Sequence, residues 1–114
     1  MSTPKAVLKA LTARDGHVCG WCGSDNETLV PQHRAGRGMG GRKSMDRLSN
    51  LIWLCAQENT DVESDASIAA AARLAGIKIS SFTENPADIP ITHAVHGRCL
   101  LTDEGTVETG LHVF

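Results

Sequence analysis

Apolar residues recur at helical spacing in two stretches of the chain. The first lies within residues 3–15, where Thr3 is the predicted N-cap and Pro4 the first helical residue. Gly16 suits the end of this helix, because glycine readily adopts the left-handed backbone angles of a helix cap. The second stretch covers residues 65–75 and ends before Gly76. We predict a helix for each stretch, the second being either separate or the continuation of a preceding helix.

Shorter apolar runs predict strands. Residues 28–33 alternate loosely and predict a strand that ends at His33, and residues 51–54 are apolar throughout, as in a core strand. A helix is predicted to run on from Cys55 past Glu63. Beyond Gly76 the pattern predicts a strand at 77–80, a hairpin of 91–95 and 98–102 across His96-Gly97, and a last strand at 106–108. The fold class is therefore α+β, with residues 15–64 as a ββα core and 65–114 as a helix and a C-terminal antiparallel β extension.

Length and composition favour one globular domain. The chain has 114 residues, of which 41% are hydrophobic and 21% charged, and this balance excludes a disordered protein. No apolar run approaches the ~20 residues of a membrane span, and the first residues lack the pattern of a secretory signal. Two of the four cysteines form a C-x2-C pair, whose spacing suits a metal better than a long structural disulfide. We therefore expect a cytoplasmic protein with no membrane partner.

Charge is distributed unevenly along the chain. Residues 1–57 hold eight Lys or Arg and four Asp or Glu, a balance of +4, whereas residues 58–114 have a balance of −6. Five basic residues fall in the loop 34–47: Arg34, Arg37, Arg42, Lys43 and Arg47. A basic face on an acidic body suits contact with a phosphate backbone, and the loop alone would equally fit a solvated turn.

The glycines of the same loop invite comparison with a phosphate-binding loop. The pattern G-x4-G-K-[ST] fails here because Arg42 separates Gly41 from Lys43. These glycines instead indicate a tight turn between the two strands of a hairpin, close to a ligand.

Cys19 and Cys22, followed by Gly23, are typical of a zinc knuckle, in which backbone amides turn to face the sulfurs. Cys55 is the natural third ligand. The fourth ligand is open among Glu58, His17, Cys99 and a water, and two reduced core cysteines in a turn are the alternative to a metal site.

The order of these motifs resembles the HNH endonuclease family, or ββα-metal nucleases. The chain has a cysteine knuckle, then Pro31-Gln32-His33-Arg34, then a basic loop, and then a run from Asn50 that matches the family tail N-L-x-x-L-C-x-x-C-H. Glu58 replaces the last cysteine of that tail and Asn59 replaces its final histidine. The resemblance covers about a third of the chain, and the small single-domain form looks like the stand-alone HNH proteins of bacteriophages.

The resemblance implies metal-dependent cutting of double-stranded DNA. His33 would be the general base, and Asn50 would hold the hairpin loop and so orient the histidine. Mg²⁺ or Mn²⁺ would be bound through Asn59, with Glu63 and Gln32 as further ligands, and the basic loop would grip the DNA backbone.

An HNH-like module that binds DNA or a protein partner without cutting is the alternative. Gln32 favours it, because the family usually has Asp, His or Glu at this position and an amide is a poorer ligand for a hard cation. Asp61 is a candidate to compensate. His93, His96 and His112 have no motif partners and are interpreted as structural or surface residues.

Overall fold

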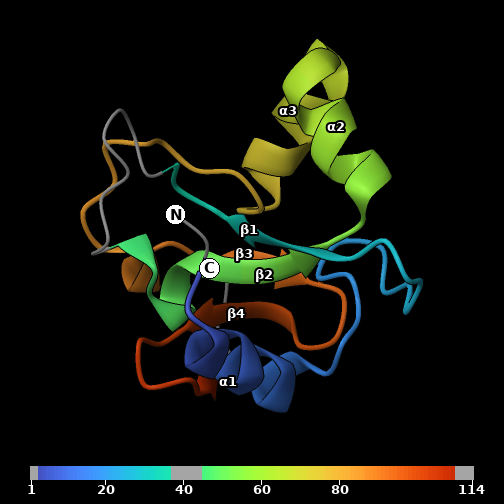
Figure 1. Ribbon diagram of the computed structural model, residues 1–114. Helices are drawn as coiled ribbons and strands as arrows, with labels where there is room; N and C mark the ends of the chain where they lie inside the picture. Colours follow the sequence, from blue (N-terminus) through green and yellow to red (C-terminus); the bar gives the residue numbers. More distant parts are fainter. Residues whose placement is uncertain (1–2, 37–44, 110–114) are drawn as a thin grey trace.

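The computed structural model describes residues 3–36 and 45–109, and within these ranges the fold is a mixed α+β fold (Figure 1). The helices are α1 (Lys5–Asp15), α2 (Ala56–Ser64) and α3 (Ala66–Leu74), with 3-10 turns η2 (Leu48–Asn50) and η3 (Pro86–Asp88). The strands are β1 (Val30–His33), β2 (Leu51–Leu54), β3 (Ile91–His93), β4 (Gly97–Leu101) and β5 (Val107–Glu108). The predicted fold class is confirmed. None of the helices in these ranges has the length and apolar composition that a membrane crossing needs.

Strand β2 lies at the centre of the hydrophobic core. It pairs with β1 in an antiparallel hairpin in which His33 faces Leu51 and Val30 faces Leu54. All four β2 residues are buried, which explains why the run is apolar at every position rather than at alternate ones. Figure 1 shows α2 and α3 on one side of this hairpin and α1, with β4, on the other.

The knuckle between α1 and β1 joins the two sheets. The Gly20 amide donates to the carbonyl oxygen of Trp53 in β2 at 2.7 Å, and its own carbonyl accepts from Ala94, beyond β3, at 2.8 Å. The β3-β4-β5 sheet is antiparallel throughout, as the predicted hairpin and last strand require.

The helix boundaries follow local chemistry. Helix α1 begins at Lys5 with Pro4 at the N-cap and no capping side chain, so the prediction of Thr3 as N-cap is wrong by one residue. Helices α2 and α3 are separate, because the Asp65 carboxylate accepts from the Ser67 and Ile68 amides and begins a new helix.

The predicted strand at 77–80 is absent from the described residues. Only an isolated parallel bridge between Ala35 and Ile79 occurs there, with the Ile79 amide donating to the Arg34 carbonyl at 2.9 Å. Gly76 redirects the chain with φ +74°, and a Cβ at this position would lie 2.1 Å from the Pro90 oxygen. The segment is therefore held by this one bridge and by the buried Ile77 side chain, and not by a strand ladder.

Arg34 is fully buried, although it follows the last residue of β1. Its guanidinium donates to four carbonyl oxygens, which belong to Gly76, Ser49, Pro86 and Ile89, at 2.8–3.3 Å. Burial lowers the pKa of Arg34 to about 10, so the side chain remains charged at neutral pH. The prediction that Arg34 contacts DNA is wrong, because no phosphate can reach it.

We expect Arg34→Ala to lower the free energy of unfolding by about 3–5 kcal/mol, because it leaves buried carbonyls without donors and opens a cavity. Arg34→Lys should retain part of this stability, since one ammonium cannot replace a planar fork of donors. Urea unfolding measures both, and the exposed Arg98→Ala is the control, with a change within about 0.5 kcal/mol. A loss of unfolding free energy below about 1 kcal/mol for Arg34→Ala would contradict this role. If the alanine variant fails to fold, an Arg34→Lys variant as stable as the native protein would contradict it.

Candidate functional site

Three cysteines and one glutamate converge at one end of the β1–β2 hairpin. Cys19 and Cys22 lie in the knuckle, Cys55 is the N-cap of α2, and Glu58 lies in the first turn of that helix. One ligand atom from each of the four lies within 4.8 Å of the others. The Cys19 thiol donates to Glu58 Oε1 at 2.8 Å, and the sulfurs of Cys22 and Cys55 are 3.4 Å apart. These four residues, hereafter the cysteine cluster, could hold a metal ion.

Neighbouring groups already face the sulfurs of the cysteine cluster. The backbone amides of Trp21 and Cys22 each donate to Cys19 Sγ at 3.4 Å, as the knuckle motif predicts, and the side-chain Nδ2 of Asn26 donates to Cys55 Sγ at 3.2 Å. Burial raises the pKa of the Cys19 thiol, so without a cation the thiol stays protonated near neutral pH. Such N–H···S contacts stabilise the thiolates that form when a cation binds and the thiol protons are released.

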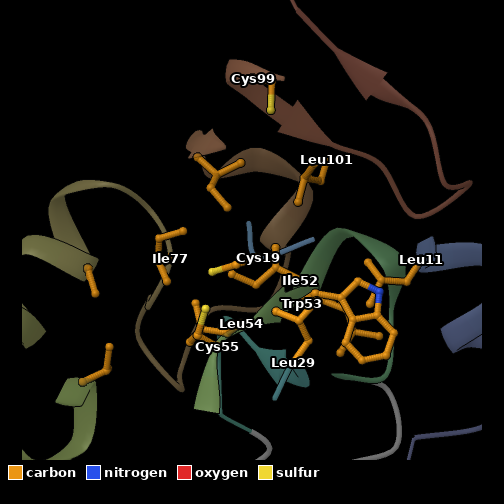
Figure 2. Packing of buried hydrophobic residues seen from close by; sticks show 14 residues of the cluster. Leu11, Cys19, Leu29, Ile52, Trp53, Leu54, Cys55, Ile77, Cys99 and Leu101 are labelled. Atoms are coloured by element: carbon orange, nitrogen blue, oxygen red, sulfur yellow. The ribbon is translucent and has the colours of Figure 1, made fainter. Parts of the chain in front are cut away.

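The predicted convergence of Cys19, Cys22 and Cys55 is confirmed, and Glu58 is the fourth member. The other candidates lie elsewhere. His17 packs edge-on against Trp53 with ring centroids 4.6 Å apart. Cys99 is buried on β4, and Figure 2 shows it apart from Cys19 and Cys55.

His33 and Asn50 meet at the opposite end of the same hairpin. The Asn50 side chain accepts from the Ala35 amide at 2.7 Å and donates to the carbonyls of Ala35 and Met45 at 3.0 Å each. One buried amide thus ties together the two ends of the loop that follows His33, and the predicted bonding of Asn50 to this backbone is confirmed. The His33 ring contacts Asp46, its Nε2 lying 2.6 Å from Oδ1.

Sequence reasoning missed Asp46. It is the one acidic residue in the sequence of the loop 34–47, and no motif position marks it.

Among the described residues, no hydrogen bond joins the side chain of a predicted cation ligand to the His33 ring. Glu63 has a side chain 68% exposed and lies 3.7 Å from Lys78, so its prediction as a metal ligand gains no support. Gln32 precedes His33 in β1 and donates to its backbone carbonyl at 3.3 Å. Asn59 lies in α2, and among the described residues no hydrogen bond joins its side chain to His33.

The basic residues of the loop 34–47 also have different roles. Arg47 donates to both carboxylate oxygens of Asp103, to the Glu84 carbonyl and to Asn85. A surface cavity of about 590 Å³ beside it is lined by ten residues, of which five are acidic and repel phosphate. Arg47 therefore joins two parts of the fold, and its prediction as a DNA contact is not supported. Arg37, Arg42 and Lys43 lie outside the described residues.

A second group of ligand-type side chains joins α1 to the β3–β4 hairpin. The Asp15 carboxylate, buried at the end of α1, lies 2.8 Å from His96 Nε2 and 3.2 Å from His93 Nε2. Arg14 donates to both oxygens of Asp15 at 2.6 Å. The interpretation of His93 and His96 as structural or surface residues therefore agrees with the structure, which adds the carboxylate that both rings contact.

Hydrogen bonding argues against a metal ion in this second group. The Val95 amide donates to His93 Nδ1 at 3.0 Å, so Nδ1 holds a lone pair and the proton of the neutral ring lies on Nε2. A metal at Nε2 would displace that proton and break the Val95 bond, and the Arg14 guanidinium would repel it. The group is a charge-balanced structural contact.

No protein-family model, curated protein or solved structure matches this chain.

We expect Asp15→Asn to lower the free energy of unfolding by about 2–3 kcal/mol at pH 7. Burial raises the pKa of Asp15, but the hydrogen bonds and the charge of the Arg14 guanidinium, together with the close His93 ring, outweigh burial and hold this pKa well below its ordinary value. This stability is fully present above the unfolded pKa of about 4 and is lost as pH falls below it. Urea unfolding between pH 7 and 2 should show that the variant loses less unfolding free energy on acidification than the native protein. An equal loss in both proteins would contradict this, and Asp25→Asn is the exposed control.

Proposed function

We propose that this protein is an HNH-type, metal-dependent endonuclease that hydrolyses phosphodiester bonds of double-stranded DNA. The observation that carries the proposal is the Asn50 side chain, which bonds Ala35 and Met45 and so fixes the loop ends next to His33. The antiparallel β1–β2 hairpin followed directly by α2 supplies the ββα order that the family resemblance implies.

His33 takes the role of general base. Its Nε2 lies 2.6 Å from Asp46 Oδ1, and Nδ1 is the nitrogen that would face the attacking water. Nδ1 would accept a proton from that water as its oxygen bonds to phosphorus and the bond from phosphorus to the leaving sugar oxygen breaks. A bound Mg²⁺ or Mn²⁺ would polarise the phosphate and stabilise the leaving oxygen.

We expect the purified protein to nick supercoiled plasmid with Mg²⁺ or Mn²⁺ and to lose this activity in EDTA. His33→Ala should reduce the rate at least 100-fold, the usual contribution of a general base, while DNA binding and thermal stability stay close to native. Gel assays measure the rate, and His17→Ala is the matched histidine control. Equal nicking by native protein and His33→Ala would contradict the proposal.

A second candidate is an HNH-shaped module that binds DNA or a protein partner without cutting. Among the described residues, no group of three His, Cys, Asp or Glu side chains includes His33. The neutral Gln32 also occupies the position where the family usually places a ligand with stronger affinity for hard cations. Absence of nicking with every divalent ion, together with retained DNA binding, would favour this candidate.

We expect Gln32→Asp to lower the Mg²⁺ or Mn²⁺ concentration that gives half-maximal nicking, or to create nicking where the native protein has none. A carboxylate adds both negative charge and a hard oxygen ligand. Titration of the metal at fixed DNA concentration measures the effect, and Gln57→Asp is a control on the exposed face of α2. An unchanged metal requirement would show that position 32 binds no cation.

We propose that the metal of the cysteine cluster is a structural Zn²⁺. Zn–S bonds of about 2.3 Å in a tetrahedral site place two sulfurs about 3.8 Å apart, close to the 3.4 Å between Cys22 and Cys55. Three thiolates and one carboxylate complete four ligands and leave no open position, as in structural rather than catalytic sites.

We expect about one zinc per chain in protein purified without chelator, and a lower melting temperature after its removal, because zinc binding is coupled to folding. Cys19→Ser should lose both the zinc and the stability. Cys99→Ser, which alters a buried cysteine outside the cluster, should keep the zinc. Elemental analysis and thermal unfolding measure these effects, and zinc-free protein whose melting is insensitive to chelator would contradict the site.

A further inference from the structure

The contact between His33 and Asp46 determines which ring nitrogen of the histidine has a lone pair that can accept a proton. Nε2 lies 2.6 Å from Asp46 Oδ1, and the two side chains are 18% and 11% exposed. An ionised carboxylate only accepts hydrogen bonds, so Nε2 must carry a proton. In the neutral ring Nδ1 then holds the lone pair. We infer that Asp46 is a positioning residue that fixes the tautomer and orientation of His33, an inference whose catalytic consequence rests on the proposed nuclease function.

The fold holds this pair from both sides of the loop. Asn50 bonds the Met45 carbonyl, one residue before Asp46, and the backbone of Ala35, two residues after His33. Met45 is buried and anchors the Asp46 side of the loop. On the His33 side, the Arg34 amide donates to the Asn50 carbonyl at 2.8 Å. The histidine and the carboxylate therefore rest on backbone held by the same asparagine, whatever the conformation of residues 37–44.

Two other roles for Asp46 make different predictions. A carboxylate that only stabilises the fold would alter melting without affecting the ring of His33. A carboxylate that binds the catalytic cation would alter the metal concentration needed for activity. A positioning carboxylate alters the tautomer of His33 and the rate of the chemical step, and leaves DNA affinity and metal requirement unchanged.

The first experiment reads the ring nitrogens of His33 directly, by ¹⁵N–¹H correlation NMR of the whole protein at a pH where the ring is neutral. Native protein should show the proton on Nε2. Asp46→Ala should show a mixture of tautomers, Asp46→Asn a smaller change because its amide oxygen still accepts, and Asp25→Asn none. A single Nε2–H tautomer in Asp46→Ala would overturn the inference, whether or not the protein cuts DNA.

The second experiment measures nicking. Asp46→Ala should lower kcat by about 10- to 100-fold with KM for DNA and the half-saturating Mg²⁺ or Mn²⁺ unchanged, and Asp46→Glu should recover part of the loss. Native kcat in Asp46→Ala would overturn the inference. So would a rate restored by excess metal, which would identify Asp46 as a ligand. If the native protein does not nick DNA but its His33 tautomer depends on Asp46, the nuclease proposal fails and the positioning contact stands.

Discussion

The buried guanidinium of Arg34 is the contact on which the candidate site depends. A buried charge is costly unless it is hydrogen-bonded, and each of the three guanidinium nitrogens of Arg34 donates to at least one carbonyl oxygen. Its partners come from the turn after α3, from η2 and from the segment around η3. The negative end of α3 also lies near this cation, because Gly76 follows Ala75, the C-cap residue of that helix. Since Arg34 directly follows His33, the same bonds that join the second half of the chain to the hairpin also fix the end of β1.

The hairpin separates two sites that have different tasks. Asn50 precedes β2 and Cys55 follows it, so four strand residues, roughly 13 Å at 3.3 Å per residue, lie between the amide that bonds the histidine loop and the cysteine cluster. The cysteine cluster joins the knuckle to α2, whereas Asn50 joins the ends of one loop. Removal of a metal from the cluster would therefore affect the packing of α2 and the knuckle first, and His33 only through the fold.

The features that were predictable from sequence are those encoded by local spacing. The C-x2-C pair, Cys55 at the start of a helix, and the strand ending at His33 each depend on a few neighbouring residues, and the structure bears them out. Arg34 could not be recognised as buried, because its acceptors are backbone carbonyls up to 55 residues away and carry no side-chain signature. The apolar alternation at 77–80 suggested a strand, yet the turn at Gly76 leaves that segment only one bridge to the rest of the fold. Asp46 and the Asp15 contacts likewise depend on tertiary packing.

The same packing changes what the charge pattern means. The first half of the chain owes its balance of +4 to eight basic residues, but Arg14 and Arg34 are buried and Arg47 is paired with Asp103. Within the loop 34–47 this leaves Arg37, Arg42 and Lys43 as candidate phosphate contacts. Each phosphate contact contributes about 0.9 to the slope of log K against log salt, so in the proposed DNA complex these three residues would contribute a slope of at most about 2.7. A steeper salt dependence would require basic residues from another surface, such as Lys5 and Lys9 on the exposed side of α1.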